Sequence, residues 1–190
     1  GSEMCIRDRE SYVGVDNLLQ NCAGKVLSSH VPTDGNLVAY QVNDILIGNI
    51  RPYLRKIWFA NNNGGTNGDV LTIRGKDDDV LRPRYLYYVL SSEDFFQYDT
   101  NNSKGAKMPR GDKEAVMKYQ FSLPPLQRQE EIISILDRFE ILCNNISAGL
   151  PAEIEARQKQ YEYYRDKLLS FKEFCLLYTS DAADDTPCVD

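Results

Sequence analysis

The chain has 190 residues, a formal net charge of −6, 42% apolar residues and 26% charged residues. This length is enough for one domain with its own core and an appendage, and the composition is ordinary for a globular protein. No apolar run approaches the roughly 20 residues that cross a bilayer, and the start of the chain has no apolar stretch of signal-peptide length, so membrane insertion and export are not expected.

Both ends of the chain differ in character from the part between them. SEMCIRDR near the start and CLLYTSDAADD near the end resemble translated library-adapter sequence, so we expect residues 1–10 and 174–190 to be a non-native leader and tail. A pair of frayed native termini is the alternative. The tail holds four acids and no base, and without it the net charge of the chain is −2.

Residues 11–123 combine strand and helix patterns, and we expect one compact α/β domain with a mixed sheet. Clusters of apolar and β-branched residues predict strands in 11–19, 37–60 and 69–75. A turn is expected near Arg51-Pro52, because proline cannot donate to a strand ladder.

The remaining segments of this domain alternate between loop and ordered patterns. Residues 61–69, rich in glycine and asparagine, are typical of a loop. Residues 82–97 have helical spacing, with Pro83 suited to a first turn. Residues 118–126 predict a strand that leaves the domain through two prolines.

A helical region follows over residues 124–173. Its apolar residues are spaced 4, 3, 4, 3 and 4 apart: Ile132, Leu136, Phe139, Cys143, Ile146 and Leu150. This spacing is the a/d alternation of a coiled coil. A lone helix cannot bury such a stripe, so we expect a homodimer or pairing with a missing second half. Gly149 and Pro151 interrupt the pattern, and they either form a hairpin or kink a rod.

Three tyrosines lie close together in RQKQYEYYRDKLL (157–169). Helical periodicity places Tyr161 and Tyr164 on about the same side, with Leu168 on the same stripe as Tyr161, and directs Tyr163 away. A catalytic cluster needs a titrating partner, and no histidine or cysteine is near. We therefore expect this face to pack on another protein.

The sequence contains few of the residues that carry chemistry. None of the five cysteines forms a C-x-x-C pair, and His30 is the only histidine, so we expect no zinc site and a reduced, cytoplasmic setting. Cofactor-binding glycine motifs, a P-loop and the common hydrolase motifs are absent, as is the N-P-P-Y type of methyltransferase motif. We expect no cofactor and no catalysis.

Two stretches are locally basic. The first, RPYLRK (51–56), contributes Arg51, Tyr53, Arg55 and Lys56. The second, SKGAKMPRGDK (103–113), contributes Lys104, Lys107, Arg110 and Lys113 against one acid, Asp112. Basic, flexible loops on a rigid domain are suited to phosphates and base edges. Two solvated surface loops are the alternative interpretation, and charge alone favours it.

Taken in order, these motifs resemble one known family. GNIRPYLRKIWFA and GGTNGDVLTIR are followed by FSLPPLQRQEEIISILDRF, with its PPL-x-x-Q step at 124–129, and then by EIEARQKQYEYYRDKLLSF. Over about residues 11–173 the chain is similar to the DNA-specificity subunits of type I restriction–modification systems. Members usually have two target-recognition domains, each followed by a helical region.

The resemblance implies a role without catalysis for this chain. Residues 11–123 would be one target-recognition domain that reads half of a split sequence in double-stranded DNA. Residues 124–173 would be a spacer that meets the second half and the methylating subunits of a complex that also holds a restriction subunit. The chain would be a half-size subunit that dimerises or one half of a longer protein, and the character of its ends favours the second.

On this resemblance we expect seven residues of the basic loops to contact DNA: Arg51, Tyr53, Arg55, Lys56, Lys104, Lys107 and Arg110. Lys104, Lys107 and Arg110 would mainly hold phosphates, and Arg51 or Arg55 would read a base edge. The alternative function is a coiled-coil assembly protein whose globular head binds another protein. DNA binding that weakens steeply with salt would support DNA recognition over the assembly function.

Overall fold

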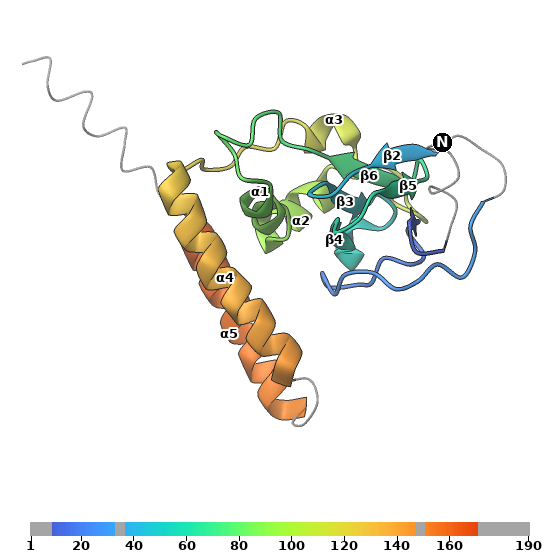
Figure 1. The fold of residues 1–190 in the computed structure, drawn as a ribbon. Coiled ribbons are helices and arrows are strands. Elements are labelled where there is room, and N and C mark those ends of the chain that lie inside the picture. The colour runs from blue at the N-terminus through green and yellow to red at the C-terminus, as the bar shows by residue number, and fades with distance from the viewer. Residues whose placement is uncertain (1–8, 33–36, 147–150, 171–190) are drawn as a thin grey trace, which may run out of the picture.

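The computed structural model describes residues 9–32, 37–146 and 151–170. Most of the expected leader and the whole expected tail lie outside these residues. A globular part carries a rod of two long helices that extends away from it (Figure 1). The expected α/β class, a mixed-sheet domain followed by a helical region, is confirmed.

Two three-stranded sheets form the β part. One has the order β1 (Tyr12–Val13), β5 (Gly64–Thr66), β2 (Val38–Tyr40), with β1 parallel and β2 antiparallel to β5. The other has the order β4 (Ile57–Phe59), β3 (Ile45–Gly48), β6 (Val70–Ile73), and both of its pairings are antiparallel.

The central strand β3 separates two apolar clusters. Ile45 and Ile47 lie in a cluster with the helices, whereas Leu46 lies in a smaller one with Trp58 and Val70. Successive side chains of a strand point to opposite faces. The run of isoleucine and leucine in this strand therefore reflects burial on both sides.

The expected loop at 61–69 was wrong for its centre, which forms β5. A Cβ atom at Gly64 would overlap the backbone oxygen of Ser11 and would lie 2.6 Å from the hydroxyl of Tyr40. Glycine is thus required here because two neighbouring segments approach closely. A tertiary contact, rather than local propensity, creates the strand.

The expected helix at 82–97 is two helices, α1 (Pro83–Leu90) and α2 (Glu93–Asn101). They are separated at Ser91-Ser92, where the Ser92 hydroxyl accepts a hydrogen bond from the Phe95 backbone N–H and caps α2. Serine is favoured at this position because its oxygen satisfies a free N–H of the first turn.

The expected strand at 118–126 was wrong, because this segment has no strand partner. It passes over the helices instead, where the ring of Tyr119 packs 5.1 Å from that of Phe95. A short helix, α3 (Lys113–Val116), precedes it.

The long helices are α4 (Leu126–Ile146) and α5 (Pro151–Leu169). They pack side by side, and α5 runs back along α4 toward the globular part (Figure 1). Of the two possibilities at Gly149-Pro151, the structure has the fold-back, although residues 147–150 lie outside the described part.

Candidate nucleic-acid interface

The fold brings the two basic loops into direct contact. The backbone N–H of Arg51 donates to the carbonyl of Pro109 at 2.7 Å, and that of Gly111 donates to the carbonyl of Asn49 at 3.0 Å. Ile50 and Arg110 form an isolated antiparallel bridge between these two bonds. Segments about 60 residues apart in the sequence therefore form one continuous surface.

Five of the seven residues predicted to contact DNA are exposed on these joined loops: Arg51, Tyr53, Lys104, Lys107 and Arg110. Two of them already pair with carboxylates, Lys104 with Asp112 at 2.5 Å and Arg110 with Asp69 at 3.1 Å. The hydrogen bond from Lys104 lowers the pKa of the Asp112 carboxyl below its usual range. Exposed pairs of this kind are weak and readily exchanged.

The other two predicted residues are engaged inside the chain. The guanidinium of Arg55 pairs with Glu93 at 2.7 Å and lies over the ring of Phe96. The ammonium of Lys56 donates to the carbonyl of Val15 at 2.6 Å. These side chains hold η1 (Pro52–Leu54) and β4 against their neighbours, which leaves their predicted DNA contacts without support from the geometry.

A buried polar cluster lies beneath the junction of the loops. Asp99 is fully buried and Asn49 nearly so, and neither Asp99 oxygen nor Asn49 Oδ1 has a hydrogen-bond partner among the described residues. Both side chains converge on Gly111, where a Cβ atom would lie 2.5 Å from Asp99 Oδ1 and 2.8 Å from Asn49 Oδ1. Burial, together with the nearby charge of Asp112, raises the pKa of Asp99 to about 6.

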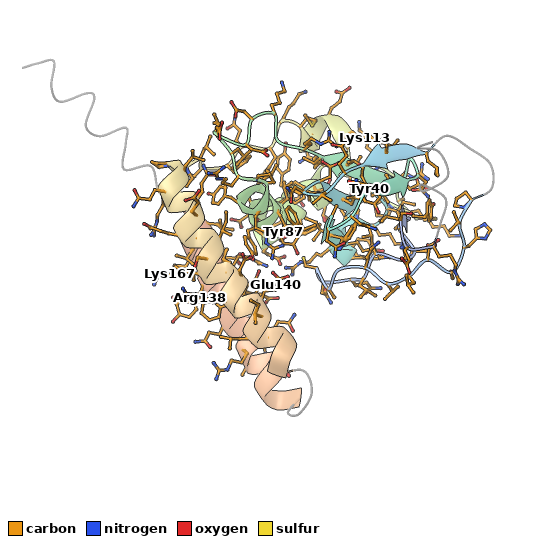
Figure 2. The ribbon with its side chains drawn as sticks, in the orientation of Figure 1. Tyr40, Tyr87, Lys113, Arg138, Glu140 and Lys167 are labelled. Atoms are coloured by element: carbon orange, nitrogen blue, oxygen red, sulfur yellow. The ribbon has the colours of Figure 1, made fainter. Side chains whose placement is uncertain are left out.

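The joint between globular part and rod is formed by polar and apolar contacts. The fully buried side chain of Gln129 accepts from the Arg82 N–H and donates to the carbonyls of Val80 and Pro124, each at 2.9 Å. Arg84 on α1 donates to Asp137 at 2.9 Å and also pairs with Glu140, which lies on the side of the rod facing α1 (Figure 2). The PPL-x-x-Q motif at 124–129 thus connects the globular part to the rod.

The predicted helical stripe is divided between two environments. Ile132 and Leu136 are fully buried in the same cluster as α1. Further along, Phe139 stacks on Tyr164 with ring centroids 5.9 Å apart. The other partly buried members are Cys143, Tyr161 and Leu168. Leu150 and the side chain of Ile146 lie outside the described part. Contacts within the chain therefore bury the first residues of the stripe, Ile132 and Leu136. The pairing of the stripe with a second chain stays a prediction.

Among the rod residues whose side chains are described, the exposed large apolar or aromatic ones are Ile141, Leu142, Tyr163 and Tyr164. The first two were not predicted from the sequence, because they fall between the a/d positions of the stripe. The labelled Arg138 and Lys167 lie on the opposite side of the rod from Glu140 (Figure 2). The rod thus exposes both apolar and charged residues, and two of them, Arg138 and Ile141, line a hollow shared with Phe59 and Arg84 of the globular part.

The described residues hold no group of three or more histidine, cysteine, aspartate or glutamate side chains placed to bind a metal ion. Among the same residues, no helix combines the length and apolar character needed to cross a membrane.

Comparison with known proteins identifies relatives of one kind. The family model described as "Type I restriction modification DNA specificity domain" matches residues 16–156. The chain is 39% identical over 88 residues to the type I restriction enzyme EcoR124I/EcoR124II specificity subunit of Escherichia coli, which covers 46% of the chain and 22% of that protein. It is 34% identical over 128 residues to a putative type I restriction enzyme specificity subunit of Haemophilus influenzae, which covers 67% of the chain and 32% of that protein.

Solved structures with the same fold include the HsdS subunit from Thermoanaerobacter tengcongensis. It has a TM-score of 0.55 at 19% identity, over 82% of this chain and 39% of that one. The S subunit of a type I restriction-modification system from M. genitalium has a TM-score of 0.52 at 17% identity, over 78% of this chain and 36% of that one. The matches thus span about a fifth to a third of the curated relatives' length.

Proposed function

Because the chain belongs to the family of type I restriction–modification DNA specificity domains, we propose that it recognises one half of a bipartite sequence in double-stranded DNA. In this proposal, residues 11–123 read the bases and the helical rod connects the reader to the rest of the complex. The chain itself performs no catalysis and acts in the cytoplasm. The alternative of an assembly protein that ignores DNA gains nothing from the family match.

The observation that carries this proposal is the contact between the two basic loops. A duplex presents closely spaced phosphates, so a useful surface must gather cations within a few ångströms of one another. The Arg51–Pro109 hydrogen bond brings together two basic segments that are distant in the sequence. The chain can bind a polyanion although its net charge is −6, because counterions are released locally where cations meet phosphates.

The proposed partners are the methylating and restriction subunits and the second half of the specificity subunit. The exposed Ile141, Leu142 and Tyr163 supply apolar contact area on the rod, and aromatic residues are enriched where one protein docks on another. A second copy of the chain is the partner expected if no longer protein exists.

The test is binding of duplex DNA by the chain together with its cognate methylating subunits, measured between about 50 and 200 mM salt. We expect affinity to fall linearly on a logarithmic salt scale, with a preference for one set of sequences. We also expect methyl transfer to DNA only when the methylating subunits are present. Assembly with these subunits but no affinity for any duplex would contradict the proposal.

A further inference from the structure

Arg51 differs from the other arginines predicted to contact DNA, and Lys107 is the one predicted lysine that shares its lack of a described carboxylate partner. Arg55 and Lys56 are used inside the chain, and Lys104 and Arg110 pair with carboxylates. Arg51 is exposed, and no carboxylate in the described part of the chain pairs with its guanidinium. It is therefore an arginine that can meet a ligand without first leaving a carboxylate of the described residues.

The backbone of Arg51 has a conformation that favours glycine. Its φ of 54° and ψ of 68° lie in the left-handed region, which is unfavourable for a residue with a Cβ atom. Strained positions of this kind concentrate at functional sites, where the surrounding structure imposes them. Arg55 has the same left-handed backbone, but its guanidinium pairs with Glu93. Arg51 combines this backbone with an exposed guanidinium.

Contacts on both sides fix the direction in which Arg51 projects. Its N–H is bound by Pro109 at 2.7 Å, and its carbonyl accepts from the Leu54 N–H at 2.9 Å. The buried Pro52 follows directly and restricts the next φ. Such a backbone has little conformational entropy left to lose on binding, so only the side chain must become ordered.

We infer that Arg51 is a specificity-determining residue that contacts the O6 and N7 acceptors of one guanine in the major groove. This inference rests on the proposed function. The planar guanidinium presents two parallel donors that match these two acceptors, whereas the ammonium of a lysine is a point charge with no such geometry. Lys107 lies among exposed neighbours in its loop and has the character of a phosphate contact.

The experiment uses the chain in complex with its methylating subunits and second half, and duplexes in which each target base pair is varied in turn. Replacing Arg51 by glycine removes the side chain and relaxes the backbone, so the variant should unfold at the same or a higher temperature. We expect Arg51→Gly to lose about 5- to 150-fold of the preference for guanine at one position, with other positions unchanged. Arg51→Gln, whose side chain is polar but shorter and uncharged, should lose the same preference.

Lys107→Ala is the matched control. It should weaken binding to all sequences alike and reduce the salt slope by about one. Retention of the wild-type preference by both Arg51 variants, or equal weakening for all sequences, would overturn the inference while leaving the proposed function intact. If the wild-type complex itself shows no preference among duplexes, the proposed function fails as well.

Discussion

The side chain of Gln129 accepts a 2.9 Å hydrogen bond from the backbone N–H of Arg82, and so joins the first turn of the rod to the residue that precedes α1. Its amide group donates to two further carbonyls. All of the hydrogen bonds of this fully buried side chain lie within the joint. This amide is therefore one of the contacts that set the orientation of the rod relative to the globular part, together with the Arg84 ion pairs and the buried Ile132 and Leu136.

Replacing Gln129 by methionine should destabilise the chain by about 2–4 kcal/mol, because a buried donor and two carbonyls would lose their partner. Chemical denaturation of the wild type and of Gln129→Met measures this loss in the free energy of unfolding. Gln127→Met is the control, since Gln127 is exposed on the same turn and its substitution should change stability by less than about 0.5 kcal/mol. Equal costs at both positions would mean that the Gln129 bonds contribute little.

The pKa of Asp99 predicts how stability changes with pH. Because the folded-state pKa is about 6 and the ordinary value is 3.8, the folded chain binds a proton that the unfolded chain has released between these values. Stability should therefore fall as pH rises from about 4 to about 6, by roughly 2–3 kcal/mol, and this effect should be constant above that.

Asp99→Asn should remove this part of the pH dependence and stabilise the chain at pH 7, since an amide carries no charge to bury. Thermal unfolding across pH 4 to 8 is the measurement, with the exposed Asp79→Asn as control. A variant less stable than wild type at pH 7 would show that the buried charge has a partner that balances it.

Gly111 should be intolerant of any side chain. A methyl group there would lie 2.5 Å from Asp99 Oδ1 and 2.8 Å from Asn49 Oδ1, and both of these side chains are buried. We expect Gly111→Ala to cost about 1–3 kcal/mol and to weaken DNA binding, because the basic loops would move apart. At Gly68 a Cβ atom would have no neighbour within 4 Å. Gly68→Ala is therefore the control, and it should change neither the free energy of unfolding nor the affinity for DNA by much.

The exposed apolar residues of the rod should matter for assembly and not for folding. Ile141 and Leu142 are 58% and 48% exposed, so replacing both by serine should leave the unfolding temperature of the chain almost unchanged. Under the proposed function it should weaken binding to the methylating subunits by at least tenfold, which titration calorimetry can measure. Phe139→Ala is the contrasting variant, because it removes the ring that stacks on Tyr164 and should destabilise the chain itself.

Local pattern predicted much of the fold, namely the central strands, the helical region and the turn at Arg51-Pro52. It could not predict β5, because GGT has low strand propensity and is a strand only through its contacts with β1 and β2. The cluster at Asp99 gave no signal, since an aspartate in a helical segment is usually exposed.

For the candidate site, the sequence identified the basic residues but not the neighbours that each of them contacts in the fold. Arg51 and Arg55 are equivalent in the sequence. They differ in the folded chain because Glu93 reaches Arg55 and no described carboxylate reaches Arg51. The stripe on α4 likewise predicted burial correctly for Ile132 and Leu136, but the apolar surface that covers them belongs to α1 in the same chain.

The joint at Gln129 also has a mechanical consequence. At 1.5 Å per residue, the 21 residues of α4 span about 30 Å, so the rod acts as a lever with its fulcrum at the globular part. A tilt of about 10° at this fulcrum would displace the far end by about 5 Å, which exceeds the 3.4 Å rise of one base-pair step. If the rod measures the gap between two half-sites, its accuracy to a single base pair is set at the fulcrum, by the stiffness of a few hydrogen bonds.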